Sequence, residues 1–497
     1  MSILSIDVGS SRCKAALINA CGEILALRTR GYTPRHPRPG YAELDPKILF
    51  EVVSSLCREV SQGASEAVQA VCFSSHGETF VPMGHDGHAL RPAILNSDMR
   101  ATAEAAACEQ RCGRERLFSI TGHVSHPMYP LPKLLWLREH EPEVFAAAGR
   151  FAGVTDYMLL RLGLEPLMDY SHAARFMALD VSTRAWSDEM LEAACIPRNK
   201  LSTPVQAGTI AGCLSAAAAG ALGAPEGTPV IVGGHDQVVG ALGMGVIGAA
   251  RAAGSLGTWE CILVASDQPQ LNPAALAASL NSYPHAVPGQ YVTIAYFPAG
   301  IMLAWLHELL YGAGADEEEH WRSLEQQAPA GPSGLLITPH LIGSCNPEFD
   351  SAATAAIGGL TTAVTRVDLF KGVLEGIASE LAVITECLAS ANAAFDDINV
   401  SGGGTRSRLG IQLRAALTGK QLHIMQSEES VCLGGAMLAA VALGHYPDLG
   451  AAARGMVHEK ECIGPEATLA EVYRPQFARY RSFRSGLVHP HPTGEQS

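Results

Sequence analysis

The sequence predicts an α/β protein of two domains. Short apolar runs typical of buried strands alternate with helix-like segments along most of the 497 residues. A chain of this length exceeds a single ordinary hydrophobic core. Residues 3–19 and 254–264 repeat one motif, in which a strand, a turn of glycine with serine or threonine, and a second strand follow one another. The repeat favours an internal duplication, with one half on either side of Asp236.

Composition and net charge limit the classes of binding partner and the cellular compartment that we expect. The net charge is −14 without a stripe of lysine and arginine, so we expect no nucleic acid and no membrane as a partner. Residues 1–7 lack the pattern of a secretory signal, and no apolar run reaches membrane-spanning length. The 13 cysteines are scattered and odd in number, which favours reduced thiols in the cytoplasm. Cys108 and Cys112 lack a paired ligand motif, so core packing is favoured over zinc.

The first predicted element is a β-hairpin over residues 3–27. Asp7 ends its first strand, and the turn Gly9-Ser10-Ser11-Arg12 offers N–H and hydroxyl donors to a phosphate, while the carboxylate attracts Mg²⁺ or its waters. Aspartate and serine also populate ordinary turns for local hydrogen-bonding reasons. The motif alone therefore leaves both interpretations open.

A second polar cluster is predicted at the end of a buried strand. Asp45 and Pro46 begin a helix that runs to about residue 60, and the strand 68–73 follows. It delivers the polar segment 76–79, and a further polar segment, 96–100, comes after a second apolar stretch. Such side chains can bind the hydroxyls of a small substrate, although a plain surface loop explains them as well.

Asp236 is the candidate base. It follows the apolar run 229–232, and a carboxylate just beyond a buried strand faces a crevice rather than the core. The glycines after it allow close backbone approach, and Gly257-Thr258 forms a further turn suited to phosphate oxygens. The alternative is a glycine-rich loop in which Asp236 caps a helix.

The second half supplies another predicted phosphate cradle. The strand 398–400 feeds Ser401-Gly-Gly-Gly404 and then a helix, a geometry that directs N–H groups and a helix dipole at an anion. The Lys-Ser/Thr ending of a P-loop is missing, which disfavours that class. The other elements expected are a strand at 291–295, a helix that opens after Pro130 and Pro132 and runs to 140, and helices at 214–223, 299–311, 368–390, from Gly434 onward, and at 473–483.

The order of these parts resembles the FGGY family of carbohydrate kinases, within the actin, hexokinase and chaperone ATPase superfamily. The resemblance covers nearly the whole chain. Residues 128–136, with Pro130, Lys133 and Trp136, are similar to one signature stretch of the family, and residues 358–375 are similar to the other, except that Gly372 replaces the usual alanine or serine.

The resemblance implies two actin-like (ribonuclease-H-like) domains, each a mixed five-stranded sheet flanked by helices, around a central cleft. Residues 1–246 would form the sugar-binding domain with the catalytic base, residues 247–488 the ATP-binding domain, and residues 489–497 a tail. The family also makes a homodimer possible. Closure of the cleft would exclude water and limit wasteful ATP hydrolysis.

The resemblance also assigns roles to residues. Asp236 would be the general base and Asp7 would organise Mg²⁺. The sugar would contact His76, Gly77, Glu78, Asp98, Arg100, Asp236 and Gln237. ATP would contact Gly9, Ser10, Ser11, Arg12, Gly257 and Thr258 at its phosphates, and Gly402, Gly403, Gly404, Thr405, Arg406 and Ser407 toward the adenosine.

The expected reaction is the ATP-dependent phosphorylation of a primary hydroxyl on a ketose such as a pentulose, or on a sugar alcohol. Residues 76–79 keep the glutamate of the Gln-Arg-Glu-Thr of glycerol kinases without its arginine. Residues 96–100 resemble the Asn-Asp-x-Arg of ketose kinases with one residue inserted or shifted. The subfamily is therefore left between glycerol-kinase-like and xylulokinase-like.

Three departures from the family motivate an alternative, a catalytically silent relative that senses a sugar or nucleotide. Gly410 stands in the place of a common tryptophan, Ala416 in that of an aspartate, and residues 343–346 replace Gly-Glu-Arg-Thr. The presence of Asp7 and Asp236 favours the kinase. A chaperone or filament ATPase and a nicotinamide dehydrogenase are weaker hypotheses, the latter because the glycine loops lack GxGxxG.

Overall fold

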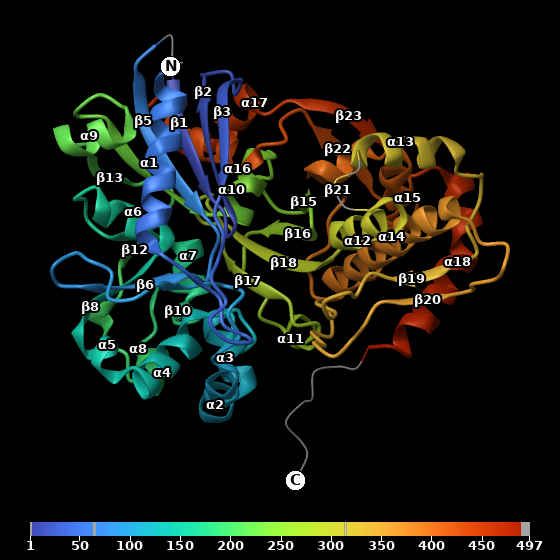
Figure 1. Ribbon diagram of the computed structural model, residues 1–497, viewed down its shortest axis with the longest axis horizontal. Helices are drawn as coiled ribbons and strands as arrows, with labels where there is room; N and C mark the ends of the chain where they lie inside the picture. Colours follow the sequence, from blue (N-terminus) through green and yellow to red (C-terminus); the bar gives the residue numbers. More distant parts are fainter. Residues whose placement is uncertain (1, 63–65, 313, 315, 489–497) are drawn as a thin grey trace.

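The computed structural model describes residues 2–62, 66–312, 314 and 316–488, and the predicted tail, 489–497, lies outside them. Two lobes lie side by side, each built on one large sheet (Figure 1). The first sheet has the order β13-β14-β5-β1-β2-β3 and consists of β1 (Ser2–Val8), β2 (Arg12–Ile18), β3 (Ile24–Gly31), β5 (Val68–Ser75), β13 (Ile210–Cys213) and β14 (Pro229–His235). The second has the order β17-β18-β16-β15-β21-β22-β23 and consists of β15 (Arg251–Leu256), β16 (Trp259–Ser266), β17 (Asn281–Pro284), β18 (Tyr291–Pro298), β21 (Asp397–Ser401), β22 (Gln421–Met425) and β23 (Glu459–Ile463).

Both sheets contain the same five-stranded core. An antiparallel meander, β1-β2-β3 in one and β15-β16-β18 in the other, is extended by two parallel strands, β5 and β14 or β21 and β22. The repeated motif in the sequence therefore marks a repeated half of the fold. The sheets have six and seven strands rather than the predicted five, because β13, β17 and β23 add antiparallel pairs at the edges.

Strand β1 is buried on both faces, in keeping with the apolar side chains of Ile3, Leu4, Ile6 and Val8. Leu4 and Ile6 join the core cluster that contains residues of α1 (Pro46–Gln62), whereas Ile3 joins the cluster beneath α16 (Ser430–Ala442). Alternate side chains of one strand thus anchor helices on opposite faces of the first sheet.

Two helices cross between the lobes. Each begins shortly after the last parallel strand of its own sheet core and packs against the other sheet: α10 (Asp236–Gly243) on β15 and β16, and α16 on β1 and β5. Their backbones touch, since a Cβ at Gly243 would lie 1.9 Å from Ser430 O and one at Gly434 2.0 Å from Val239 O. Only glycine fits at these two positions.

This crossing corrects one sequence prediction. The helix expected from Gly434 begins at Ser430 instead. Glycine usually marks helix ends, yet Gly434 lies inside this helix because the neighbouring backbone leaves no room for a side chain.

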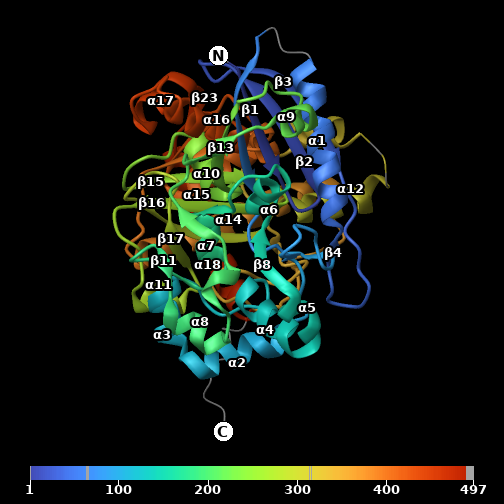
Figure 2. The same ribbon diagram turned by 90° about the vertical axis from the view of Figure 1, so that its left-hand side faces the viewer.

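Residues 76–209, between β5 and β13, form an insertion in the first lobe, and most of it lies in the lower half of both views (Figures 1 and 2). Its helices are α2 (Thr102–Cys112), α3 (Arg114–Thr121), α4 (Pro130–His140), α5 (Pro142–Ala147), α6 (Val154–Arg161), α7 (Tyr170–Arg175) and α8 (Asp188–Ala194), followed by η1 (Arg198–Lys200). Its strands are β6 (Phe80–Gly84), β7 (Ala93–Ile94) and β8 (Ala148–Gly153), which join β4 (Glu43–Leu44), and the pairs β9 (Leu167–Asp169) with β12 (Thr203–Val205) and β10 (Leu179–Asp180) with β11 (Ala185–Trp186).

The remaining helices are α9 (Ala216–Leu222) in the first lobe and α11 (Pro273–Ala277), α12 (Gly300–Tyr311), α13 (Glu317–Gln327), α14 (Arg366–Ser390), η2 (Gly403–Arg406), α15 (Arg408–Thr418), α17 (Leu449–Met456) and α18 (Ala467–Ser485) in later parts of the chain. A short pair, β19 (Leu336–Thr338) with β20 (Ala356–Gly358), lies beside α14. The predicted helices and strands are confirmed apart from shifts of their first and last residues. Sequence patterns define these boundaries less well than they define the elements themselves.

Candidate active site

Asp236 is the first residue of α10 and follows the last residue of β14 directly. Its side chain is 19% exposed. Oδ1 accepts a hydrogen bond from the Gln237 amide at 2.6 Å and lies 3.3 Å from Nε2 of His235. Burial raises the pKa of Asp236 to about 8, and the charges of Asp7 and Glu78 add to the effect. A carboxylate in this setting binds a proton more strongly than one in water, as a base requires.

Asp7, near the end of β1, lies close enough to Asp236 to interact with its charge. Burial raises the pKa of Asp7 to about 6, with Lys14 opposing the shift and Glu429 adding to it. Its Oδ1 is buried and has no hydrogen-bond partner within the described residues. A buried carboxylate oxygen without a donor fits a cation or its water ligands, so the residues present fit the predicted Mg²⁺.

A cavity of about 860 Å³ lies along the second lobe, and Arg12 of the first lobe also lines it. The predicted nucleotide residues that line it are Arg12, Gly257, Thr258, Gly403, Gly404, Arg406 and Ser407. The others support the turns behind it: Gly9 N–H donates to Arg12 O at 3.0 Å, and Thr405 N–H donates to Gly402 O at 3.1 Å. All three predicted phosphate-binding segments, the turns at 9–12 and 257–258 and the triple glycine, thus contribute residues to one cavity.

The far end of the cavity contains side chains that the sequence did not single out. Trp321 of α13 stacks on Phe370 with ring centroids 5.0 Å apart. Glu325 accepts hydrogen bonds from the Ser407 hydroxyl at 2.8 Å and the Leu409 amide at 2.7 Å. Glu325 therefore ties α13 to the start of α15 and closes this end of the cavity.

A buried ion pair accounts for one departure from the family pattern. Arg414 pairs with Glu260 at 2.8 Å and donates to Gly410 O at 2.9 Å. A Cβ at Gly410 would lie 3.1 Å from Nη1 of Arg414. The guanidinium therefore occupies space beside Gly410, which leaves little room there for a large side chain.

The polar segment after β5 has structural partners. Both ring nitrogens of His76 are engaged, by Val8 O at 2.8 Å and Thr79 Oγ1 at 2.7 Å, and burial lowers the pKa of His76 to about 4. Gly77 leaves room for a neighbouring ring, since a Cβ there would lie 3.0 Å from Cδ2 of His235. Glu78 has a positive φ of 62° and is 4% exposed. His76 therefore fixes the position of the segment 76–79. Glu78 is the acidic residue of that segment.

Glu78 is paired with Arg175, a residue that no local motif marked. Arg175 ends α7, and its guanidinium carbon lies 5.0 Å from the Tyr129 ring centroid and 5.5 Å from that of Tyr283. Tyr283 belongs to β17, so the second lobe contributes to this cluster. Only the folded arrangement brings these residues together, and sequence spacing offers no signal for them.

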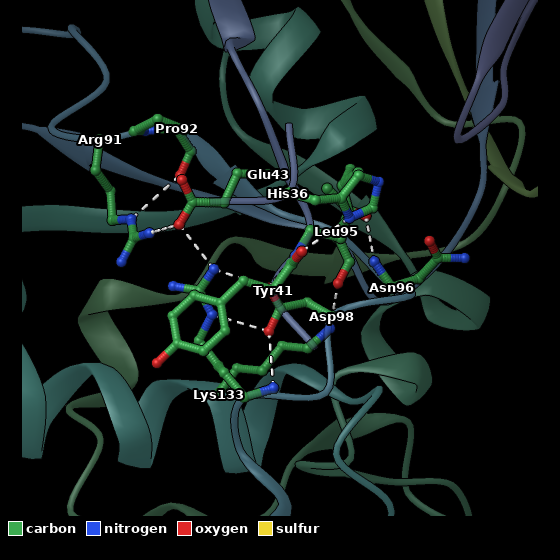
Figure 3. Close-up of polar contacts among 12 residues, drawn as sticks. His36, Tyr41, Glu43, Arg91, Pro92, Leu95, Asn96, Asp98 and Lys133 are labelled. Carbon is green, nitrogen blue, oxygen red and sulfur yellow. Dashed lines mark hydrogen bonds and ion pairs between the residues drawn. The ribbon is translucent and has the colours of Figure 1, made fainter. Parts of the chain in front are cut away.

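Asp98 and Arg100 belong to a buried network (Figure 3). Asp98 Oδ2 accepts from the Ala42 amide at 2.6 Å and pairs with Arg100 at 2.8 Å, and Arg100 also pairs with Glu43 at 2.7 Å. The Arg100 guanidinium lies 4.1 Å from the Tyr41 ring centroid. Both charged groups are engaged within the protein, and their assignment as direct sugar ligands stays a prediction.

Lys133, from the first signature stretch, lies fully buried beside this network (Figure 3). Its Nζ donates to Leu95 O and Met128 O, both at 2.6 Å. Burial lowers the pKa of Lys133 to about 7, with Asp98 and Glu78 opposing the shift. The lysine thus joins two loops around the predicted sugar site.

Comparisons with known proteins place the chain in a family. The N-terminal domain model of the FGGY family of carbohydrate kinases matches residues 2–243, and the C-terminal domain model matches residues 252–443. The chain belongs to the FGGY family of carbohydrate kinases. It is a carbohydrate kinase, and kinases of this family use ATP with Mg²⁺.

Named relatives span nearly the whole chain. The xylulose kinase of Escherichia coli is 30% identical over 98% of this chain and 99% of its own length. The gluconokinase of Bacillus licheniformis is 26% identical over 89% and 88%. The crystal structure of gluconate kinase from Lactobacillus acidophilus superimposes with a TM-score of 0.89 at 27% identity, covering 98% of both chains. Among the described residues, no helix combines the length and apolar character needed to cross a membrane.

Proposed function

We propose that this kinase phosphorylates a primary hydroxyl of a small neutral ketose, such as a pentulose, with Asp236 as the general base. The observation that carries the proposal is the position of Asp236 at the start of α10. Its neighbour Gln237 accepts a hydrogen bond from the Ser255 hydroxyl at 3.1 Å, two residues before the Gly257-Thr258 turn that lines the cavity. Relatives named xylulose kinase support a ketose as the acceptor. The silent-sensor alternative has no support in these relatives.

In the proposed reaction, Asp236 accepts the proton of the acceptor hydroxyl as that oxygen attacks the γ-phosphorus of ATP. The hydroxyl becomes acidic only as the new bond forms, so a carboxylate with a pKa near 8 is a sufficient base. Arg12 and the Gly257-Thr258 turn would hold phosphate oxygens. Bound at Asp7, Mg²⁺ would supply positive charge to the phosphate oxygens.

The paired arginines favour a neutral acceptor over gluconate. A substrate carboxylate needs a cation, and the two arginines nearest the predicted sugar residues are already neutralised: Arg175 by Glu78, and Arg100 by Asp98 and Glu43. Lys133 donates to backbone carbonyls and is fully buried. Within the described part of this region, charge complementarity therefore favours hydroxyl groups as the ligand.

A panel of acceptors tests the proposal. ADP release is measured with purified protein and Mg-ATP in the presence of pentuloses, hexuloses, glycerol, other sugar alcohols and gluconate. We expect stimulation by a ketose and none by gluconate. Stimulation by gluconate alone would overturn the neutral-acceptor assignment, and stimulation by a sugar alcohol alone would move the acceptor to the glycerol-kinase-like class.

The division into a sugar domain, 1–246, and an ATP domain, 247–488, is part of the same proposal. It is supported by the last strand of the first sheet, which ends at His235, and the first strand of the second, which begins at Arg251. A cytoplasmic location and a homodimer stay predictions, which fractionation and light scattering would check.

A further inference from the structure

His235 lies between the proposed base and the second lobe. It ends β14 and is 5% exposed. Its Nε2 is 3.3 Å from Asp236 Oδ1, and its Nδ1 is hydrogen-bonded to the Tyr283 hydroxyl at 3.2 Å. Tyr283 is fully buried in β17, the edge strand of the second sheet. One imidazole therefore connects the carboxylate of one lobe to a hydroxyl of the other.

The protonation states of this chain follow from its surroundings. Burial lowers the pKa of His235 well below its ordinary value, with Arg175 contributing, so the ring is neutral and carries one N–H. Burial raises the pKa of Tyr283, which keeps its hydroxyl protonated. In its ionised form, the form that can accept a proton, Asp236 favours the hydrogen on the neighbouring Nε2. Nδ1 is then an acceptor, and the Tyr283 hydroxyl is its donor.

Close contacts fix the position of the His235 ring. The His235 amide donates to Ser171 Oγ at 3.0 Å, and Gly77 leaves the ring its space. The charged and titratable groups that face the ring, besides Asp236 and Tyr283, are Arg175, His172, His76 and His123. With the ring held in this position, a Tyr283 hydroxyl that donates to Nδ1 keeps the ring hydrogen on Nε2.

We propose that Tyr283 and His235 are positioning residues for the base: Tyr283 holds His235 in the tautomer whose Nε2–H faces Asp236. The inference rests on the proposed function of Asp236. The Gln237 amide and His235 Nε2 both approach Oδ1, so Oδ2 is the oxygen that would accept the proton of the acceptor hydroxyl. The second lobe thereby helps to orient a base that belongs to the first.

The primary test is the turnover of Tyr283→Phe with the acceptor found in the panel. We expect kcat to fall about tenfold, the worth of one hydrogen bond, while KM for the acceptor stays within about twofold because Tyr283 acts through His235. Tyr157→Phe is the matched control. Tyr157 is equally buried and donates to Pro46 O at 2.8 Å, in a part of the first lobe remote from the cavity. The kcat of Tyr157→Phe should equal that of the wild type.

A double-mutant cycle separates positioning from a general structural role. In His235→Gln the amide can still offer an N–H to Asp236 but no longer depends on the tyrosine, so adding Tyr283→Phe should change kcat little. His235→Ala should lose more activity than His235→Gln. Melting temperatures of all variants show whether the fold is kept.

Two results would overturn the inference. One is a Tyr283→Phe enzyme with wild-type kcat, and the other is an equal loss from Tyr283→Phe in the wild-type and His235→Gln backgrounds. A failure of the proposed function is separate from these results, because it would appear as full turnover in Asp236→Asn, whatever the behaviour of Tyr283→Phe.

Discussion

At the residue scale, the burial that raises the pKa of Asp236 also lowers the stability of the folded protein. Its folded-state pKa, about 8, lies above the ordinary value of 3.8. An acid with a raised folded pKa destabilises the folded protein at every pH above its unfolded pKa, and the penalty grows until the pH passes the folded pKa. Function and folding therefore make opposite demands on this carboxylate.

The first prediction follows from the upward direction of this pKa shift. Asp236→Asn, without Mg²⁺ or nucleotide, should be more stable than the wild type at pH 7.5, by roughly 1–4 kcal/mol. The advantage should shrink as the pH falls and disappear below the unfolded pKa of 3.8, where the wild-type carboxyl is protonated in both states. Thermal melts at several pH values measure it, and a variant less stable than the wild type at pH 7.5 would contradict the burial of this charge.

The second prediction concerns the buried pair of Arg175 and Glu78. Arg175→Leu should destabilise the protein by about 3–5 kcal/mol, because it leaves a buried carboxylate without its partner. Arg116→Leu is the control: Arg116 pairs with Glu189 at 2.5 Å, but the two side chains are 59% and 47% exposed, so its melting temperature should hardly change. Equal effects of the two substitutions would argue against the buried pair.

At the element scale, the contact of α10 with α16 fixes how the lobes meet. The third prediction is that Gly243→Ala destabilises the protein markedly, because its Cβ would overlap Ser430 O of the other helix. Gly220→Ala in α9 is the matched control, since no atom lies within 4 Å of its Cβ position. That substitution should leave stability unchanged or raise it by up to ~1 kcal/mol. Melting temperatures compare the two, and a tolerated Gly243→Ala would refute the close crossing.

The fourth prediction concerns the triple glycine before α15. Gly402 has a φ of 107°, and a Cβ there would lie 2.7 Å from Leu256 O, whereas the Cβ position of Gly403 is open. Gly402→Ala should therefore distort the cradle, weaken ADP binding and lower the melting temperature. Gly403→Ala should keep the melting temperature of the wild type. Calorimetric titration with ADP and a thermal melt give both readouts; unchanged ADP affinity in Gly402→Ala would separate this segment from the nucleotide site.

At the scale of the whole molecule, local patterns predicted the repeated half-fold and the turns of the cavity. Asp7, Asp236 and the Gly257 turn could be predicted because each lies at or just beyond the end of a strand, and strand ends of this fold meet at the cleft. The roles of Arg175 and Tyr283 could not, because their contacts join segments more than 90 residues apart or different lobes. The pattern of Asp98 and Arg100 predicted a sugar site, but it could not predict that Arg100 also pairs with Glu43, which comes from a distant strand.

The central claim is that Asp236 accepts the proton during phosphoryl transfer. Rapid-quench measurement of a single turnover tests it most directly, with Asp236→Asn, Mg-ATP and the acceptor found in the panel. The account predicts transfer slower by about 10²–10⁴-fold, with affinities for ATP and acceptor within a few-fold of the wild type. Transfer at the wild-type rate in Asp236→Asn would contradict it.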